Sequence, residues 1–259
     1  MPDLFSIDLS LLDWMIFMVA GIVAGIINTL AGSGSLITLP IFVFLCGLPP
    51  TIANGTNRVG VLFQSAVGLH AHQKSGAFSF EGSIWLVIPT VIGAILGSLI
   101  AVDLNEETMN LVLGLLMVFM MIVLLIKPSR WLHDLPVAID RNKHPLTIAA
   151  FFLIGVYGGF IQAGVGIFLL AGLVLISRYT LRSGNGIKLL IVLIFAIPTL
   201  AVFLWFNQVH LGYGLAMALF QAIGAYLAVK FVVRINNADV WIHRLLIAIV
   251  AVAAIKFLL

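Results

Sequence analysis

Six predominantly apolar segments constrain this chain more than any other feature of its sequence. About 20 residues of helix cross the hydrocarbon core of a bilayer, and each segment is close to that length. Only 9% of the 259 residues are charged and 62% are hydrophobic, whereas a soluble domain carries about 25% charged residues. We therefore predict an all-α polytopic membrane protein that lies in the lipid bilayer. The segments are Ala53–His72, Ser83–Val102, Met109–Ile126, Gly186–Phe206, Gly214–Val233 and Val240–Leu258.

Two further apolar regions are interrupted by glycine. Trp14–Cys46 contains the sequence Ala-Gly-Ser-Gly-Ser at 31–35, and Thr147–Ser177 contains Gly-Gly at 158–159 and Gln-Ala-Gly-Val-Gly at 162–166. Each region is too long for one span, and the arm after the break, about a dozen residues, is too short to cross alone. We predict that each forms a broken, re-entrant helical hairpin.

The two halves of the chain resemble each other at a shift of about 131–132 residues. This pattern predicts a duplicated unit of one hairpin and three transmembrane helices. The expected boundaries are 1–126 for the first repeat, 127–146 for a cytoplasmic linker and 147–259 for the second repeat. The matching segments are 31–34 with 163–166, 53–55 with 184–186, and 93–94 with 224–225.

The distribution of positive charge favours hairpins over single crossings. If both broken regions return to their own face, every Lys and Arg except Arg58 and Lys256 falls on one side, as the positive-inside rule requires. That side is then the cytoplasm, and the N-terminus lies outside. Because three spans is an odd number, the second repeat is expected to be inverted relative to the first.

The breaks and the segments that follow them supply the candidate binding residues. A broken membrane helix is costly unless its free backbone groups find partners or line a cavity, and half-helix N-termini can direct N–H groups at an anion. Close helix packing by glycine is the alternative for the breaks, and snorkelling to lipid phosphate is the alternative for the two cations. The candidates are Asn28, Thr29, Gly32, Ser33, Gly34, Ser35, Asn54, Thr56, Asn57, Arg58, Gln162, Gly164, Gly166, Asn185 and Lys188.

The acidic residues are informative by their positions. All ten lie in the N-terminal tail, in loops or beside the ends of segments, which argues against a cation carrier or a carboxylate-based proton pump. His70 and His72 are expected as solvated interfacial residues. Cys46 is the single cysteine, and we find no metal-ligand spacing, no nucleotide-binding loop and no catalytic constellation. We therefore expect no metal, no cofactor, no nucleic-acid partner and no enzymatic activity.

A pattern of small residues and prolines runs through the first half and recurs in weaker form in the second. It comprises Ala24-Gly25, Gly32-Ser33-Gly34-Ser35-Leu36, Pro40, Gly47-Leu48-Pro49-Pro50, Ala53-Asn54-Gly55-Thr56-Asn57, Ser75-Gly76, Gly93-Ala94 and Gly97. This pattern resembles the sulfite exporter TauE/SafE family. The resemblance implies a permease of the bacterial inner membrane for sulfite, sulfonates or related organic anions. The second half departs from the pattern at Val165 and Ile187, where the first half has Ser33 and Thr56.

The leading hypothesis is an alternating-access carrier for sulfite or an organosulfonate. The substrate would lie between the two breaks, held by backbone N–H groups and by Ser33, Ser35, Asn57 and Gln162. Arg58 and Lys188 would attract it at opposite mouths. A passive anion channel and a membrane-embedded enzyme are the alternatives. Proton coupling, with the proton carried on a weakly acidic substrate, and a homodimer stay open.

Overall fold

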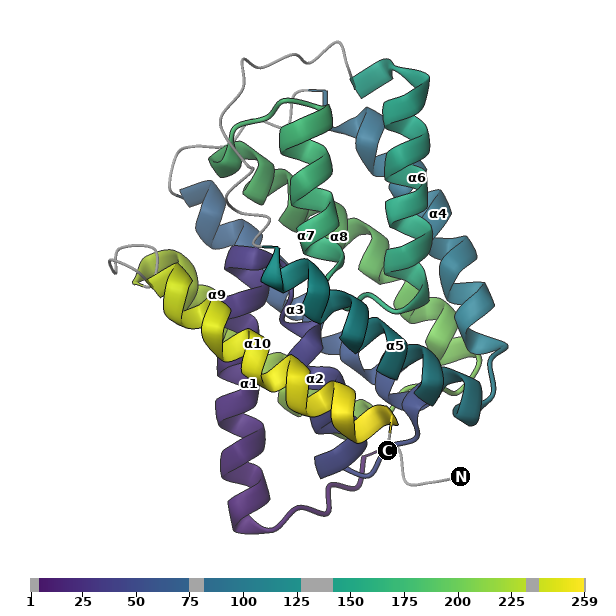
Figure 1. Ribbon diagram of the computed structural model, residues 1–259, viewed down its shortest axis with the longest axis vertical. Helices are drawn as coiled ribbons and strands as arrows, with labels where there is room; N and C mark the ends of the chain where they lie inside the picture. The colour runs from purple at the N-terminus through teal and green to yellow at the C-terminus, as the bar shows by residue number, and fades with distance from the viewer. Residues whose placement is uncertain (1–4, 75–81, 127–141, 232–237, 259) are drawn as a thin grey trace.

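The computed structural model describes residues 5–74, 82–126, 142–231 and 238–258, and the described part of the chain contains helices and no strand (Figure 1). Each of the six predicted segments falls in one long helix, although residues 232 and 233 of the fifth lie outside the described part. This confirms the all-α polytopic membrane fold. These helices are α3 (Pro50–Lys74), α4 (Ile84–Val102), α5 (Glu106–Leu125), α8 (Leu181–Trp205), α9 (Leu211–Lys230) and α10 (Ala238–Leu258).

Five described helices are long and apolar enough to cross a membrane: α1 (Leu11–Ala31), α4, α5, α8 and α9. α3 is not among them, although it has 25 residues, because the polar residues of 54–58 lie in its first half. Large apolar side chains such as Ile92 on α4 and Leu115 on α5 are exposed on the outer surface, as a lipid-facing surface requires.

The first broken region is a helical hairpin. α1 ends where Gly32 adopts a left-handed conformation with φ 77°, and the chain reverses into α2 (Ser35–Pro40) and the π-helical turn η1 (Ile41–Leu45). The returning arm is therefore as short as predicted. The entering arm has 21 residues and is long enough to cross a bilayer by itself, which the sequence did not anticipate.

The second broken region repeats this design with a shorter entering arm. α6 (Pro145–Phe160) has 16 residues, and the chain reverses through positive φ at Gln162 and Gly164. It returns as α7 (Val165–Ala171) and a second π-helical turn, η4 (Gly172–Ile176). Both returning arms thus end in a π-turn, a feature that is rare and is frequent at functional sites.

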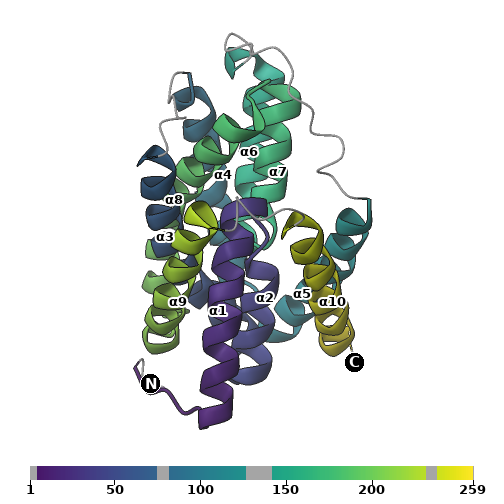
Figure 2. The ribbon, with the colours of Figure 1, turned by 90° about the vertical axis from the view of Figure 1, so that its left-hand side faces the viewer.

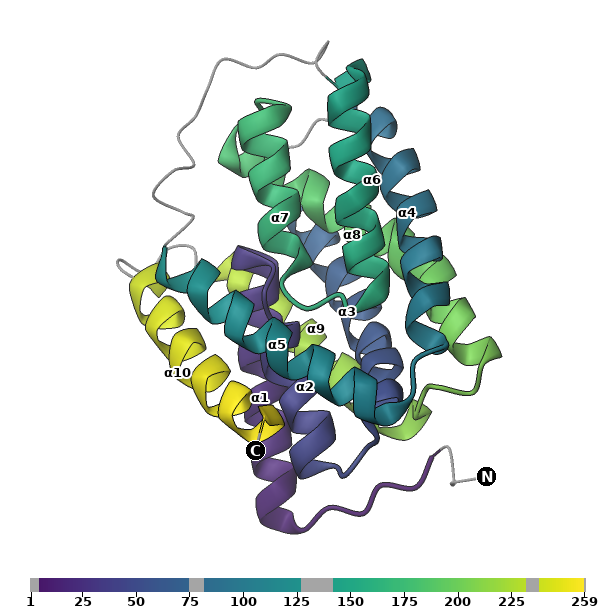
Figure 3. The same cartoon turned by 45° about the vertical axis from the view of Figure 1, so that its right-hand side comes forward.

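The two hairpins enter from opposite ends of the molecule and meet at their tips. In Figure 1, α1 rises from the bottom and α6 descends from the top, and Figure 3 shows the α6–α7 turn facing the end of α1. α4 packs against α6, and α9 packs against α1. α5 and α10 form a third pair (Figure 2). The inverted relation of the halves and the placement of the N-terminus outside stay predictions. Of the expected linker at 127–146, residues 127–141 lie outside the described part.

Glycine allows α4 and α6 to approach within backbone contact. A Cβ on Gly97 would lie 2.0 Å from the Val156 carbonyl oxygen, and a Cβ on Gly159 would lie 1.9 Å from the carbonyl oxygen of Ala94. Small residues four apart let membrane helices pack this closely. The packing alternative is therefore correct for Gly159, which the sequence placed in the second break.

Gly97→Ala is expected to destabilise the protein by about 1–3 kcal/mol, the usual cost of overpacking a tight contact. The added methyl group meets rigid backbone rather than a side chain that can move. Gly68→Ala in α3 is the matched control, because its Cβ would meet only side-chain atoms at 3.5 Å or more. Thermal unfolding of both variants in detergent measures the difference. Equal melting temperatures would contradict this account of the α4–α6 contact.

The two histidines at the end of α3 differ from each other. His70 is exposed, as expected. His72 is 8% exposed, and its Nε2 lies 3.1 Å from the carbonyl oxygen of Arg182. The expectation of a solvated residue is wrong for His72, because the end of α3 packs against the start of α8.

Candidate functional site

The centre of the molecule is the contact between the two hairpin tips. The Gly166 N–H donates a hydrogen bond of 3.1 Å to the Gly32 carbonyl oxygen. A Cβ on either glycine would lie 2.3 Å from the Cα of the other. Glycine at both positions is thus required for the two breaks to touch.

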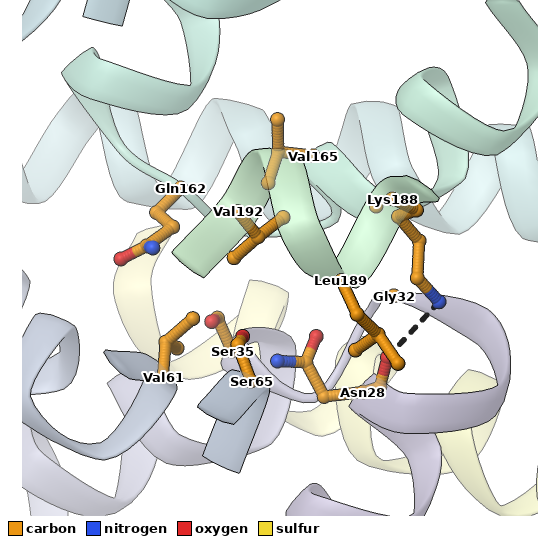
Figure 4. Close-up of a pocket in the computed structure, with 11 residues that line it drawn as sticks. Asn28, Gly32, Ser35, Val61, Ser65, Gln162, Val165, Lys188, Leu189 and Val192 are labelled. Carbon is orange, nitrogen blue, oxygen red and sulfur yellow. Dashed lines mark hydrogen bonds between the residues drawn. The ribbon is translucent and has the colours of Figure 1, made fainter. Parts of the chain in front are cut away.

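A small cavity lies beside this contact (Figure 4). Its volume of about 10 Å³ corresponds to roughly one water molecule, so the space between the tips is very small. In Figure 4, Lys188 and Gln162 lie on opposite sides of the group, with Asn28, Ser35 and Ser65 between them. The lining residues are Asn28, Gly32, Ser35, Val61, Ser65, Gln162, Val165, Gly166, Lys188, Leu189 and Val192.

Lys188 brings a positive charge to this cavity. Its side chain is 1% exposed, and its Nζ donates to the carbonyl oxygens of Thr29 at 3.0 Å and Asn28 at 3.4 Å. Both carbonyls belong to the last turn of α1, where the helix dipole is negative, and the Asn28 carbonyl also accepts from the Gly32 N–H at 2.9 Å. A cation from α8 therefore caps the inner end of α1.

Arg58 occupies a comparable position at the other hairpin. Its side chain is fully buried, and its Nη2 donates to the carbonyl oxygens of Gly159 at 2.5 Å and Phe160 at 3.5 Å, at the end of α6. Its guanidinium carbon lies 4.3 Å from the centre of the Phe203 ring, within the range of a cation–π interaction. Its Nε and Nη1 find no hydrogen-bond acceptor among the described residues.

Snorkelling to lipid phosphate is therefore wrong for both Arg58 and Lys188. The sequence places each cation within the first turns of a span, close to an interface. The structure shows that each long side chain reaches inward instead, to the end of a helix from the other hairpin. Neither position could be read from the sequence, since the capped carbonyls lie about 100 and 160 residues away.

Two polar networks hold the first hairpin. In one, Asn57 donates from Nδ2 to Ser35 Oγ at 2.9 Å and accepts from Thr38 Oγ1 at 2.5 Å. In the other, Gln64 accepts from Asn28 Nδ2 and donates to Thr29 Oγ1 at 3.0 Å. These bonds satisfy side chains that would otherwise be buried without partners, and they fix the shape of the break.

Several cavity groups are unpartnered. Ser65 Oγ, Gln162 Oε1 and Gln162 Nε2 are buried and find no hydrogen-bond partner within the described part of the chain. Buried polar groups are normally paired because leaving one unpaired costs about 1–3 kcal/mol. These atoms, with Lys188, are the ones available to a ligand in the cavity.

The structure brings six of the predicted residues together around the cavity: Asn28, Gly32, Ser35, Gln162, Gly166 and Lys188. The other nine lie outside its lining: Thr29, Ser33, Gly34, Asn54, Thr56, Asn57, Arg58, Gly164 and Asn185. Asn54 donates to the Phe160 carbonyl at 2.8 Å, so it supports the second tip.

Thr56 belongs to a different contact, with the loop before α9. Its Oγ1 accepts from the His210 N–H at 2.8 Å. His210 Nδ1 in turn accepts from the Tyr213 N–H at 3.3 Å and caps α9. Burial lowers the pKa of His210, which keeps the neutral ring that this cap requires.

Sequence reasoning missed the α3 and α8 residues that complete the lining. Ser65 follows Val61 by four residues and Arg58 by seven, and Val192 follows Lys188 by four. Residues at these spacings share one helix face. This spacing was the available signal for Ser65 and Val192, although it does not say which face of α3 or α8 meets the hairpin tips. Within the ranges that the structure describes, no group of three His, Cys, Asp or Glu could hold a metal ion.

An apolar helix bundle with two broken helices meeting at buried cations is the architecture of a polytopic membrane transporter. The family model of the sulfite exporter TauE/SafE matches residues 17–257, and the chain belongs to this family. This confirms the resemblance read from the glycine and proline pattern.

Similar curated proteins share most of the chain. A "Probable membrane transporter protein ORF9" of Sinorhizobium sp is 26% identical over 240 residues, which cover 93% of this chain and 90% of that protein. A "Probable membrane transporter protein" of Xylella fastidiosa (strain 9a5c) is 27% identical over 69% of each chain. "Probable membrane transporter protein YfcA" of Escherichia coli (strain K12) is 23% identical over 99% of this chain and 93% of that protein. No solved structure matches the chain significantly.

Proposed function

We propose that this transporter carries a small anion, sulfite or an organosulfonate, by alternating access between two inverted repeats. The observation that carries the proposal is the pair of buried cations at the hairpin tips, of which Lys188 lines the cavity. Burying a cation without an anionic partner is costly. An anion at the tips would supply that partner.

The charge distribution supports an anion over a cation. Arg58 and Lys188 lie in stretches, 14–80 and 141–238, that contain no Asp or Glu. Carriers of cations and protons rely on acidic groups within the membrane. No carboxylate from these two stretches can therefore neutralise the positive charges of Arg58 and Lys188.

The arrangement of the hairpins supports alternating access. Inverted-repeat transporters bind substrate near mid-membrane, where broken helices from the two repeats meet. Here the tips touch at Gly32 and Gly166, and the hairpins approach from opposite ends (Figure 1). The proposed orientation has the N-terminus outside a bacterial inner membrane and residues 127–146 inside.

The family description supports sulfite as the first substrate to test, since its name is that of a sulfite exporter. The cavity also has an apolar side, formed by Val61, Val165, Leu189 and Val192. A sulfonate with a short alkyl group would suit that side. Proton linkage through a weakly acidic substrate and a homodimer remain part of the proposal.

Uptake of labelled sulfite and of a short alkanesulfonate into proteoliposomes tests the proposal. We expect uptake above that of protein-free liposomes, and faster uptake when the vesicles are preloaded with the unlabelled anion. Such counterflow distinguishes a carrier from a passive channel. Uptake without counterflow would favour the channel, and no uptake of either anion would overturn the proposed substrate class.

A further inference from the structure

The two buried cations are connected crosswise between the hairpins. Arg58, in the half that contains α1, holds the inner end of α6, and Lys188, in the half that contains α6, holds the inner end of α1. Each cation binds carbonyl groups in the last turn of a broken helix, where the helix runs out of N–H groups; of these carbonyls, that of Asn28 also accepts from the Gly32 N–H at 2.9 Å. Neither contact involves a carboxylate.

The two contacts lie on opposite sides of the hairpin tips. α3 begins directly after the first hairpin, and Arg58 is in its third turn, so Arg58 lies toward the end at which the first hairpin enters. α8 begins directly after the second hairpin, and Lys188 lies toward the opposite end. Each cation therefore holds the tip of a hairpin that is anchored at the far end of the molecule.

We infer that Arg58 and Lys188 are the two gating residues of this transporter, each closing one side of the central cavity by capping a broken helix from the other half. Release of α1 by Lys188 allows the first hairpin to withdraw and opens the cavity toward the end where α8 begins. Release of α6 by Arg58 opens it toward the end where α3 begins.

The chemistry of the contacts suggests what releases them. A lysine or arginine side chain binds a charged oxyanion more strongly than a neutral carbonyl, because the oxyanion carries a full negative charge and the carbonyl oxygen only a partial one. An oxyanion in the cavity thus competes with the α1 carbonyls for Lys188. This exchange step rests on the proposed function, whereas the capping contacts do not.

Arg58 is prepared for the same exchange. Its Nη2 holds the α6 carbonyls, while its Nε and Nη1 have no acceptor within the described ranges. A guanidinium group can bind an oxyanion through two parallel N–H groups. Arg58 can therefore bind an anion through Nε and Nη1 while its Nη2 still donates to the α6 carbonyl oxygens.

Thiol labelling from each side of the membrane tests the gating roles. In a Cys46→Ala background, Ser65→Cys places a reactive group on the cavity wall, because Ser65 lines the cavity and its hydroxyl is unpartnered. A membrane-impermeant thiol reagent is applied to sealed vesicles of either orientation. We expect slow labelling from both faces in this parent variant.

Adding Lys188→Met is expected to speed labelling at least about tenfold from the face where α8 begins, and Arg58→Met from the face where α3 begins. A tenfold change corresponds to about 1.4 kcal/mol, just below the range of about 1.5–3 kcal/mol for hydrogen bonds to a charged group. Lys230→Met is the control, because Lys230 is exposed, its Nζ donates to Tyr226 in its own helix, and it is not part of the cavity lining. Acceleration from both faces by one variant, or from neither face by both, would overturn the gating roles.

Hydrogen exchange of the unsubstituted protein tests the exchange step without a variant that could fail to fold. The Gly166 amide, which bonds to Gly32, reports the contact between the tips. We expect sulfite or an alkanesulfonate to speed its exchange, and gluconate at equal ionic strength to leave it unchanged. No acceleration by either sulfur anion, together with face-selective labelling, would overturn the proposed substrate and leave the gating roles supported.

Discussion

Lys188→Met is expected to lower the initial rate of anion uptake about 100-fold. The substitution keeps much of the side-chain length and removes the only charge that lines the described cavity. Losing hydrogen bonds to a charged group costs about 1.5–3 kcal/mol, and each 1.4 kcal/mol is a factor of about ten in binding. The measurement is uptake into proteoliposomes that contain equal amounts of each protein.

Lys230→Met serves as the matched control for this experiment. It removes the same charge and the same volume from an exposed position at the end of α9, and we expect it to transport at the unsubstituted rate. If Lys188→Met were as active as this control, Lys188 would have no role in binding the anion.

Gly32→Ala is expected to produce the largest loss of stability. Its φ of 77° is unfavourable for alanine, and a Cβ would lie 2.3 Å from the Gly166 Cα and 2.5 Å from its carbonyl carbon. The left-handed conformation costs about 1–2 kcal/mol, and the clash with rigid backbone adds about 1–3 kcal/mol. The two tips would have to separate, so we also expect transport to be lost.

Gly47→Ala isolates the conformational part of this effect. Gly47 also has a positive φ, 65°, but a Cβ there would meet nothing within 4 Å. The Gly47→Ala variant should therefore lose only about 1–2 kcal/mol of its free energy of unfolding and keep its transport activity. Thermal unfolding and uptake, measured on both variants, separate the two contributions. Equal effects at the two positions would show that contact between the tips is unimportant.

The glycine pattern was the most informative part of the sequence. It predicted both breaks, the family and the short returning arms, because a left-handed residue such as Gly32 ends a helix locally whatever surrounds it. The same pattern misled at Gly159. Its role is to let α4 approach α6, and a glycine required by a neighbouring helix looks in the sequence like a glycine required by a turn.

The residues that line the cavity were less predictable than the breaks. Asn28, Ser35 and Gln162 lie beside a break in the sequence and also line the cavity. Asn57 was expected to hold substrate, but its amide bonds to Ser35 and Thr38. Ser65 was missed because its contribution depends on how α3 is rotated against the hairpin tips, and that rotation is set by packing with α8 and α9.

By itself, the sequence determined residence in the membrane, the positions of six long helices and the two breaks. These are local properties, because a segment of about 20 apolar residues inserts according to its own length and composition. Only the tertiary structure decided that Arg58 and Lys188 are buried and that each caps a broken helix from the other half. Those contacts join residues about 100 and 160 positions apart, so they exist only once the hairpins have met.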